Sequence, residues 1–327
     1  MINTSVVVKR SIAALALSVA MSVSVFAGTL KVGHSTWVGY GPFYIAQEKG
    51  FFKEEGVDVE FVIMEDTAIK IGAMFANQID IAASTSDEFP SYLKPGKTVR
   101  YFMAVDYSNG GDGIVANKDI KNIAGLKGKR VAFEQGTISQ FFLNVLLIEA
   151  GMTQADIEAV NMTASDAGTA FVAGQVDAAV TWEPALSMGA NSPNGKLLAS
   201  SKELPGVIVD VLAVTGETAK AKEKDLKAFA RAWYRALDYL AKNPDESYTI
   251  MAKGVGGWIV KPEDFKAAAT GIQYLDKAAN AALFGKPGAD GTLFETVTSA
   301  IDIWKGFQKV QVDVTPADLI DQSMYGG

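Results

Sequence analysis

One short pattern of residues occurs twice in the sequence, and this repeat constrains the fold more than any other feature. Residues 75–83 read Phe-Ala-Asn-Gln-Ile-Asp-Ile-Ala-Ala, and residues 172–180 read Val-Ala-Gly-Gln-Val-Asp-Ala-Ala-Val. Each copy has the pattern of a helix end, a turn and a buried strand. We therefore predict two similar α/β units.

Predicted strands and helices alternate through both units. The expected strands cover residues 29–33, 57–63, 79–83, 130–133, 159–162 and 176–181, and the expected helices cover 43–49, 68–75, 139–149 and 167–172. The last third is expected to contain helices at 225–240, 246–253, 261–274 and 293–307, with a loop at 285–291. This alternation predicts an α/β fold of two lobes, each a mostly parallel sheet flanked by helices.

The chain is expected to cross between the lobes twice. The turn-rich stretch 107–113 leads out of the first unit, and the apolar stretch 207–214 leads back. We assign residues 28–107 and 213–327 to lobe 1, and residues 108–212 to lobe 2. Because parallel α/β sheets bind ligands beyond the carboxyl ends of their strands, a small molecule is expected in a cleft between the lobes of a monomer.

The first 27 residues have the pattern of a secretory signal peptide. Lys9 and Arg10 precede an apolar run over 11–25, and Val25 and Ala27 fit the small-residue positions before a cleavage site. The run is short for a bilayer span of roughly 20 residues. We predict cleavage after Ala27 and a periplasmic product whose net charge moves from −7 to −9, because Lys9 and Arg10 are lost.

Composition excludes several classes of protein. The chain has no cysteine, one histidine, and 30 basic against 37 acidic residues. It therefore lacks the residues for a disulfide scaffold or cysteine-based catalysis and metal binding, and it lacks the basic excess of a nucleic-acid binder. We expect no enzyme activity, no metal, no cofactor and no nucleic-acid partner.

The opening of the predicted product resembles a known family. Residues 50–56 read Gly-Phe-Phe-Lys-Glu-Glu-Gly within the segment 31–60, and 126–131 read Leu-Lys-Gly-Lys-Arg-Val. With the two Gln-(Ile/Val)-Asp turns, these residues resemble the nitrate/sulfonate/taurine-type substrate-binding proteins of ABC transporters. The resemblance covers essentially all of residues 28–327. It implies a two-lobed periplasmic binding protein fold and an inner-membrane permease as partner. The sequence also resembles a branch associated with urea and guanidine utilisation.

Loops that follow the predicted strands supply the candidate site. They contain many carboxylates and several aromatic residues, but no lysine or arginine. The carboxylates are Glu65, Asp66, Asp87, Glu88, Asp106, Asp112, Glu134, Asp166, Glu183 and Asp210. The ligand-binding candidates are His34, Trp37, Tyr40, Asp87, Asp106, Asp112, Glu134, Thr137, Trp182, Glu183 and Asp210.

This residue set favours a cation over an anion. An anion would be better matched by arginine or lysine, although helix N-termini can also hold one. A planar cation would gain charge-assisted hydrogen bonds to carboxylates and cation–π contacts with Trp37 or Trp182. Our hypothesis is guanidinium or a related nitrogen-rich cation. The alternative is taurine, an alkyl-sulfonate or a nitrate-type anion.

Several of these residues have structural interpretations. Glu65 and Asp66 can cap the helix that follows, Asp87 and Glu88 can cap the next one, and His34 can be a buried structural histidine. Glu134 and Glu183 alone would also be compatible with the catalytic carboxylate pair of a glycosidase. The absence of a nucleophile–base pair in the sequence argues against this enzymatic alternative. The loops also lack the spacing of calcium sites, and one histidine is too few for transition-metal receptors. An enzyme of the related thiamine-precursor branch would need a suitable histidine and a cysteine-rich segment. Neither is present in this sequence, so we do not expect such an enzyme.

Overall fold

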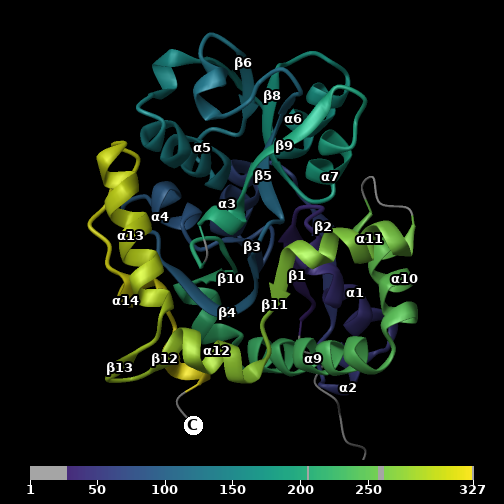
Figure 1. The fold of residues 1–327 in the computed structure, drawn as a ribbon. Helices are drawn as coiled ribbons and strands as arrows, with labels where there is room; N and C mark the ends of the chain where they lie inside the picture. Colours follow the sequence, from purple (N-terminus) through teal and green to yellow (C-terminus); the bar gives the residue numbers. More distant parts are fainter. Residues whose placement is uncertain (1–27, 205, 257–260, 326–327) are drawn as a thin grey trace, which may run out of the picture.

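The chain folds into two α/β lobes, each built around one sheet (Figure 1). The computed structural model describes residues 28–204, 206–256 and 261–325. The predicted signal peptide and its cleavage after Ala27 lie outside these residues. Within the described ranges, no helix combines the length and apolar character needed to cross a bilayer.

The larger lobe is built on a six-stranded sheet of order β11-β4-β10-β3-β1-β2. Its strands are β1 Leu30–His34, β2 Val59–Ile63, β3 Ile81–Thr85, β4 Val99–Ser108, β10 Val209–Thr215 and β11 Ile272–Tyr274. β1 pairs in parallel with β2 and β3, whereas β10 runs antiparallel between β3 and β4. The returning strand β10 therefore lies at the centre of the sheet.

Helices from both ends of the chain cover this sheet. The N-terminal helices are α1 Gly41–Glu48, α2 Phe51–Glu54, α3 Thr67–Phe75 and α4 Glu88–Tyr92. The C-terminal helices are α8 Gly216–Ala221, α9 Glu223–Lys242, α10 Pro244–Val255, α11 Pro262–Ala268, α12 Lys277–Phe284, α13 Leu293–Gly306 and α14 Pro316–Leu319. Phe43 of α1 packs edge-on against Phe229 and Trp233 of α9. Both α9 residues are fully buried and belong to the core.

The smaller lobe is built on a five-stranded sheet of order β7-β6-β8-β5-β9. Its strands are β5 Asp112–Asn117, β6 Arg130–Phe133, β7 Glu158–Asn161, β8 Ala178–Trp182 and β9 Gly195–Ser200. Its helices are α5 Ile138–Glu149, α6 Ala164–Val172 and α7 Ala185–Ala190. β6, β7 and β8 are parallel, and β5 is antiparallel to both of its neighbours.

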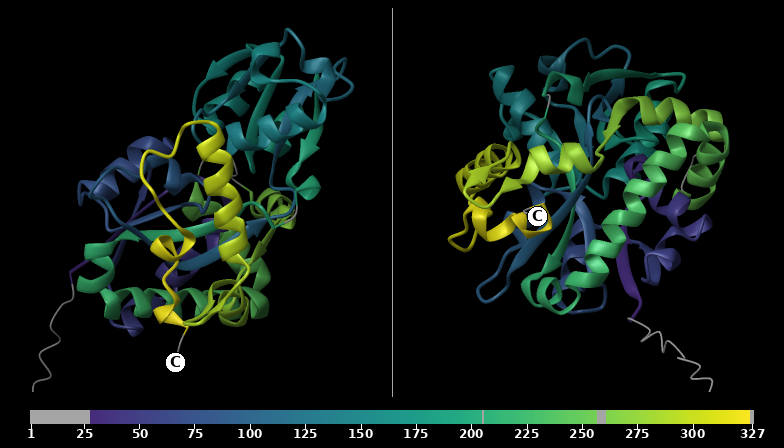
Figure 2. Two further views of the ribbon diagram at one scale, coloured as in Figure 1. Left: turned by 90° about the vertical axis from the view of Figure 1, so that its left-hand side faces the viewer. Right: turned by 90° about the horizontal axis from the view of Figure 1, so that it is seen from below.

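Two segments connect the lobes, one between β4 and β5 and one between β9 and β10. In Figure 2 the smaller lobe stands beyond one edge of the larger, and these segments run between them. The hydroxyl oxygens of Ser108 and Ser201 lie 2.8 Å apart, so the two crossings are hydrogen-bonded to each other. The backbone N–H of Gly110 also donates to the Ser201 hydroxyl at 2.6 Å. The two segments that connect the lobes are therefore linked to each other by hydrogen bonds to Ser201.

Three sequence expectations need correction. The helix expected over 261–274 ends at Ala268, because Ile272–Tyr274 pair with β4 as strand β11. The loop at 285–291 contains a small hairpin in which Gly285 and Lys286 pair with Asp290 and Ala289. Residues 209–212, assigned to lobe 2, belong to β10 of the larger sheet. The lobe division remains a proposal, with its second boundary moved to before residue 209.

Candidate functional site

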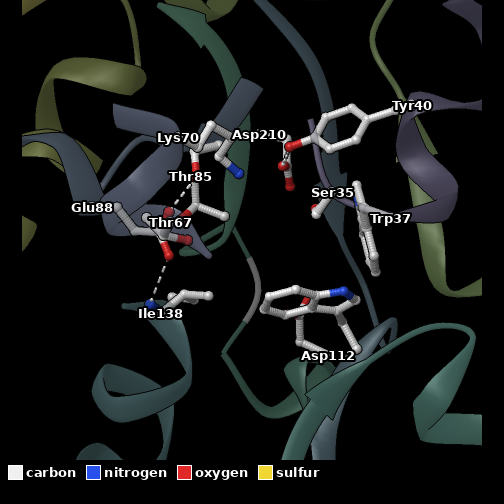
Figure 3. A pocket seen from close by; sticks show the side chains of 12 residues that line it. Ser35, Trp37, Tyr40, Thr67, Lys70, Thr85, Glu88, Asp112, Ile138 and Asp210 are labelled. Carbon is white, nitrogen blue, oxygen red and sulfur yellow. Dashed lines mark hydrogen bonds between the residues drawn. The ribbon is translucent and has the colours of Figure 1, made fainter. Parts of the chain in front are cut away.

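A small pocket lies where the ends of the two sheets face each other. Its cavity volume is about 30 Å³, well below the roughly 300–1,000 Å³ of drug-sized ligand pockets, so this arrangement of the lobes suits only a small solute. The residues that line it are Ser35, Trp37, Tyr40, Thr67, Lys70, Ser84, Thr85, Glu88, Asp112, Ile138, Trp182 and Asp210. Figure 3 shows ten of these side chains by name. Both lobes contribute, which matches the cleft that the sequence predicts.

Strand pairing places the acidic residues at this edge of each sheet. In the larger sheet, Asp210 of β10 lies opposite Thr85 of β3 on one side and Asp106 of β4 on the other. In the smaller sheet, Asp112 at the start of β5 lies opposite Trp182 at the end of β8. The pocket is therefore formed largely by strand ends, as expected for α/β folds.

Three carboxyl groups line the pocket: those of Glu88, Asp112 and Asp210. The Tyr40 hydroxyl donates to Asp210 Oδ1 at 2.5 Å. Burial raises the pKa of Asp112 to about 8 and that of Asp210 to about 7, and neighbouring carboxylates add to both shifts. Burial also raises the pKa of Glu88. The pocket therefore concentrates acidic groups whose charges are poorly solvated, and these groups would gain from a cation.

Glu88 also contacts the opposite lobe. Its Oε2 accepts a hydrogen bond from the Ser84 hydroxyl, and its Oε1 accepts one from the backbone N–H of Ile138 at 3.2 Å. Ile138 is the first residue of α5, so the carboxylate lies at a helix N-terminus. The sequence suggested that Asp87 and Glu88 cap α4, but neither side chain does so. Burial raises the pKa of Asp87 well above its usual range.

Glu134 makes the reciprocal contact from the smaller lobe. Its Oε1 accepts from the N–H of Thr67 at 3.0 Å, and its Oε2 accepts from the N–H of Ala164 at 3.3 Å. These are the first residues of α3 and α6. The Thr137 hydroxyl donates to the Glu134 carbonyl at 2.9 Å, and its oxygen caps α5 by accepting from the Ser139 N–H at 3.2 Å. Both predicted residues, Glu134 and Thr137, thus lie beside the pocket rather than in its lining. Burial raises the pKa of Glu134 to about 7.

Two tryptophans form walls of the pocket, one from each lobe. The indole N–H of Trp37 lies 3.2 Å from both carboxylate oxygens of Asp106. Asp106 therefore lies behind Trp37 and orients it rather than lining the pocket. Gly39 allows this arrangement, because a Cβ there would lie 2.0 Å from Asp106 Oδ2. Trp182, from the smaller lobe, is 9% exposed.

Two other candidates make structural contacts outside the pocket. Glu183 accepts from the N–H of Ser187 at 3.1 Å and from its hydroxyl at 2.6 Å, which holds the first turn of α7. His34 Nδ1 lies 2.7 Å from the Ser35 carbonyl and must be the donor, so Nε2 accepts from the Tyr44 hydroxyl at 2.9 Å. Burial lowers the pKa of His34 to about 4, so this histidine is neutral.

The structure adds a cation that the sequence interpretation missed. Lys70 lines the pocket and is 2% exposed. It comes from the second turn of α3 and not from one of the loops that follow the strands. The loops themselves hold no lysine or arginine, but the pocket lining includes this helix lysine. In the sequence, Lys70 is the one charged residue in the otherwise apolar run 68–75, which indicates a lysine on a largely buried helix.

Other lining residues belong to recognisable local structures. Asp66 caps α3 by accepting from the Ile69 N–H at 2.8 Å, and this helix positions Thr67 and Lys70. Ser84 and Thr85 are the last two residues of strand β3. Among the described residues, no group of three or more His, Asp or Glu side chains is arranged to hold a metal ion.

Comparison with known proteins identifies the family. The family described as "NMT1/THI5 like" matches residues 37–247. The chain belongs to this family. The resemblance predicted from the opening motifs is thereby confirmed at the level of the family and its fold.

Two curated relatives of this NMT1/THI5-like chain are binding proteins rather than enzymes, in agreement with the expected class. A binding protein of Brucella abortus (strain 2308) is 26% identical over 222 residues, which is 64% of this chain and 66% of that protein. The taurine-binding periplasmic protein of Escherichia coli (strain K12) is 24% identical over 232 residues, 70% of this chain and 68% of that protein. The chain thus matches about two thirds of the length of these relatives.

A solved structure shows the same fold as this NMT1/THI5-like protein. The periplasmic aliphatic sulphonate binding protein SsuA of Escherichia coli superposes with a TM-score of 0.71 at 18% identity, covering 91% of this chain and 99% of that one. The two-lobed periplasmic binding protein fold is therefore confirmed. At this identity the likeness supports the fold and leaves the ligand to be argued from the pocket.

Proposed function

We propose that this protein is the periplasmic receptor of an ABC-type import system. The proposal rests on the family, the two-lobed fold and a pocket lined by both lobes. In this role it captures a solute between the lobes and delivers it to an inner-membrane permease. We further propose that it acts as a monomer and is exported by cleavage after Ala27.

The proposed ligand is a small, planar, nitrogen-rich cation, with guanidinium first. One observation carries this choice: Glu88, Asp112 and Asp210 line a single pocket together with two tryptophans. Each carboxylate can accept hydrogen bonds from N–H donors of such a cation. A tryptophan face adds a cation–π contact worth about 0.5–2 kcal/mol.

The helix N-termini beside the pocket argue against a simple anion. N–H groups at the starts of α3, α5 and α6 could hold an anion, but they already donate to the protein's own carboxylates. Glu134 contacts α3 and α6, and Glu88 contacts α5. An incoming nitrate or sulfate would have to displace a carboxylate or bind beside one, and both cost free energy.

A second candidate is taurine or a related amino-sulfonate. Lys70 favours it, because an ammonium group in the pocket could receive the sulfonate while a carboxylate receives the amine. This candidate uses the same pocket, so ligand competition distinguishes it directly.

The test is a thermal-shift screen of residues 28–327 with guanidinium, methylguanidine, urea, taurine, nitrate and sulfate at low millimolar concentration. A ligand at about 100 times its dissociation constant adds roughly 2.7 kcal/mol of stability. We expect shifts with guanidinium and methylguanidine, and we expect both to be lost in Asp112→Asn. The matched control, Asp238→Asn, changes an exposed carboxylate on α9 and should keep them. Shifts with taurine or nitrate alone would overturn the cation proposal.

A further inference from the structure

Lys70 is an ionisable group in the pocket that the proposed cation does not explain. Its side chain is 2% exposed and lines the pocket from α3. Within the described part of the chain, its ammonium forms neither an ion pair nor a hydrogen bond. A buried ammonium without an acceptor is costly, so an acceptor from the ligand would satisfy it.

Neither Glu88 nor Asp210 forms an ion pair with the Lys70 ammonium. Glu88 accepts from Ser84 and from the N–H of Ile138, and Asp210 accepts from Tyr40. The charge of Lys70 opposes the raised pKa values of Glu88 and Asp210. The ammonium therefore keeps its donors available for a ligand.

Thr85 lines the same pocket, but its hydroxyl oxygen is itself buried. In Figure 3, Lys70, Thr85, Glu88 and Asp210 are all drawn above Asp112, which lies at the bottom of the view. The pocket thus presents both an ammonium group and carboxylates to a ligand.

We propose that Lys70 is a specificity-determining residue that binds an acceptor group of the ligand. The ligand is then bipolar, with a guanidinium-type end held by Asp112 and the tryptophans, and a carboxylate or carbonyl end held by Lys70. This inference rests on the proposed function and narrows its substrate class to small guanidino acids. Such a ligand matches Asp112 and Lys70 each with an opposite partner.

The test compares methylguanidine with guanidinoacetate, which adds only a carboxylate at the corresponding position. Titration calorimetry on residues 28–327 should show at least about tenfold tighter binding of guanidinoacetate, the size expected for one charge-assisted hydrogen bond. Lys70→Met should abolish this preference and should keep or strengthen methylguanidine binding, because a like charge is removed. Retained methylguanidine binding also shows that the variant is folded.

Two further variants separate charge from structure. Lys70→Arg keeps the positive charge and should keep the preference for guanidinoacetate. Lys224→Met removes an exposed lysine of α9 and should change neither affinity. Equal or tighter binding of methylguanidine by the unmodified protein would overturn the role of Lys70 and leave the cation proposal standing. Binding of taurine with no response to either guanidino compound would overturn the proposed function itself.

Discussion

The carboxylate of Glu88, in the larger lobe, accepts a hydrogen bond at 3.2 Å from the backbone N–H of Ile138, in the smaller lobe. Glu134 returns this contact from the smaller lobe by accepting from the N–H of Thr67 at 3.0 Å. Each lobe thus places one glutamate at a helix N-terminus of the other. Hydrogen bonds to charged groups contribute about 1.5–3 kcal/mol each, so these two contacts stabilise the lobes against each other, and their loss is expected to favour a more open arrangement.

Replacing Glu134 should therefore weaken closure and ligand binding together. Glu134→Gln removes the charge that two helix N-termini share, and we expect ligand affinity to fall by roughly 5- to 30-fold, or about 1–2 kcal/mol. Calorimetry gives the affinity, and small-angle scattering gives the shift toward an open shape. The control, Asp166→Asn, changes an exposed carboxylate in the first turn of α6 and should bind as before. Unchanged affinity in Glu134→Gln would contradict the closure role.

The ligand-free protein should lose stability as the pH rises from 6.5 to 8.5. Burial raises the pKa of Asp210 and Glu134 to about 7 and that of Asp112 to about 8, far above the ordinary value of about 4. In this window the folded state holds protons that the unfolded state has lost, so the free energy of unfolding decreases with pH. His34 has a pKa lowered to about 4 and is neutral throughout the window.

Thermal melting at pH 6.5, 7.5 and 8.5 checks this pH dependence. Asp112→Asn should flatten the curve between pH 7.5 and 8.5, where Asp112 loses its proton. A cationic ligand should protect more at pH 8.5 than at pH 6.5, because it binds the ionised carboxylates. A melting temperature that rises steadily with pH would show that burial does not raise the pKa values of these carboxyl groups in the folded state.

Gly39 should be intolerant of a side chain because of the contact between Trp37 and Asp106. A Cβ at Gly39 would lie 2.0 Å from Asp106 Oδ2 and 2.2 Å from Trp37 Nε1. Gly39→Ala should destabilise the protein by about 1–3 kcal/mol, typical of overpacking, and should weaken ligand binding. Gly72→Ala in α3 is the control, since nothing lies within 4 Å of its Cβ. Chemical denaturation measures both, and equal stability of the two variants would contradict the packing argument.

Glu183 should matter for stability rather than for binding. Its carboxylate holds the first turn of α7 through Ser187 and does not line the pocket. Glu183→Ala should cost about 0.5–2 kcal/mol, as for loss of a helix cap, with the dissociation constant of the ligand unchanged. Loss of binding at unchanged stability would instead support the ligand role expected from the sequence.

The repeated sequence pattern proved informative because it reports a local hydrogen-bond arrangement. The N–H of Lys31 donates to Asp80 Oδ2 at 2.9 Å, and the N–H of Arg130 donates to Asp177 Oδ2 at the same distance. Each aspartate thus joins the start of its strand to the neighbouring parallel strand, once in each lobe. A pattern fixed by contacts between successive strands can be predicted from the sequence.

Features decided by distant contacts could not be predicted in this way. Ile272–Tyr274 form a strand only because β4, more than 160 residues earlier, offers its edge. Lys70 enters the pocket because α3 is oriented by Asp66 and by Glu134 of the other lobe. From the sequence, Glu88 and Glu134 could equally be ligand contacts or structural residues. Only the folded structure shows that they accept hydrogen bonds from helix N-termini of the opposite lobe. The sequence predicted which loops meet but not the partner of each carboxylate.

The charge of the ligand is tested most directly by counting the protons exchanged on binding. Titration calorimetry of residues 28–327 at pH 7 with guanidinium, in two buffers of different ionisation enthalpy, gives this number. The account predicts saturable binding with proton release, because a cation lowers the raised pKa values of Asp112 and Asp210. Saturable binding of nitrate or taurine with proton uptake, and no response to guanidinium, would contradict a site built for cations.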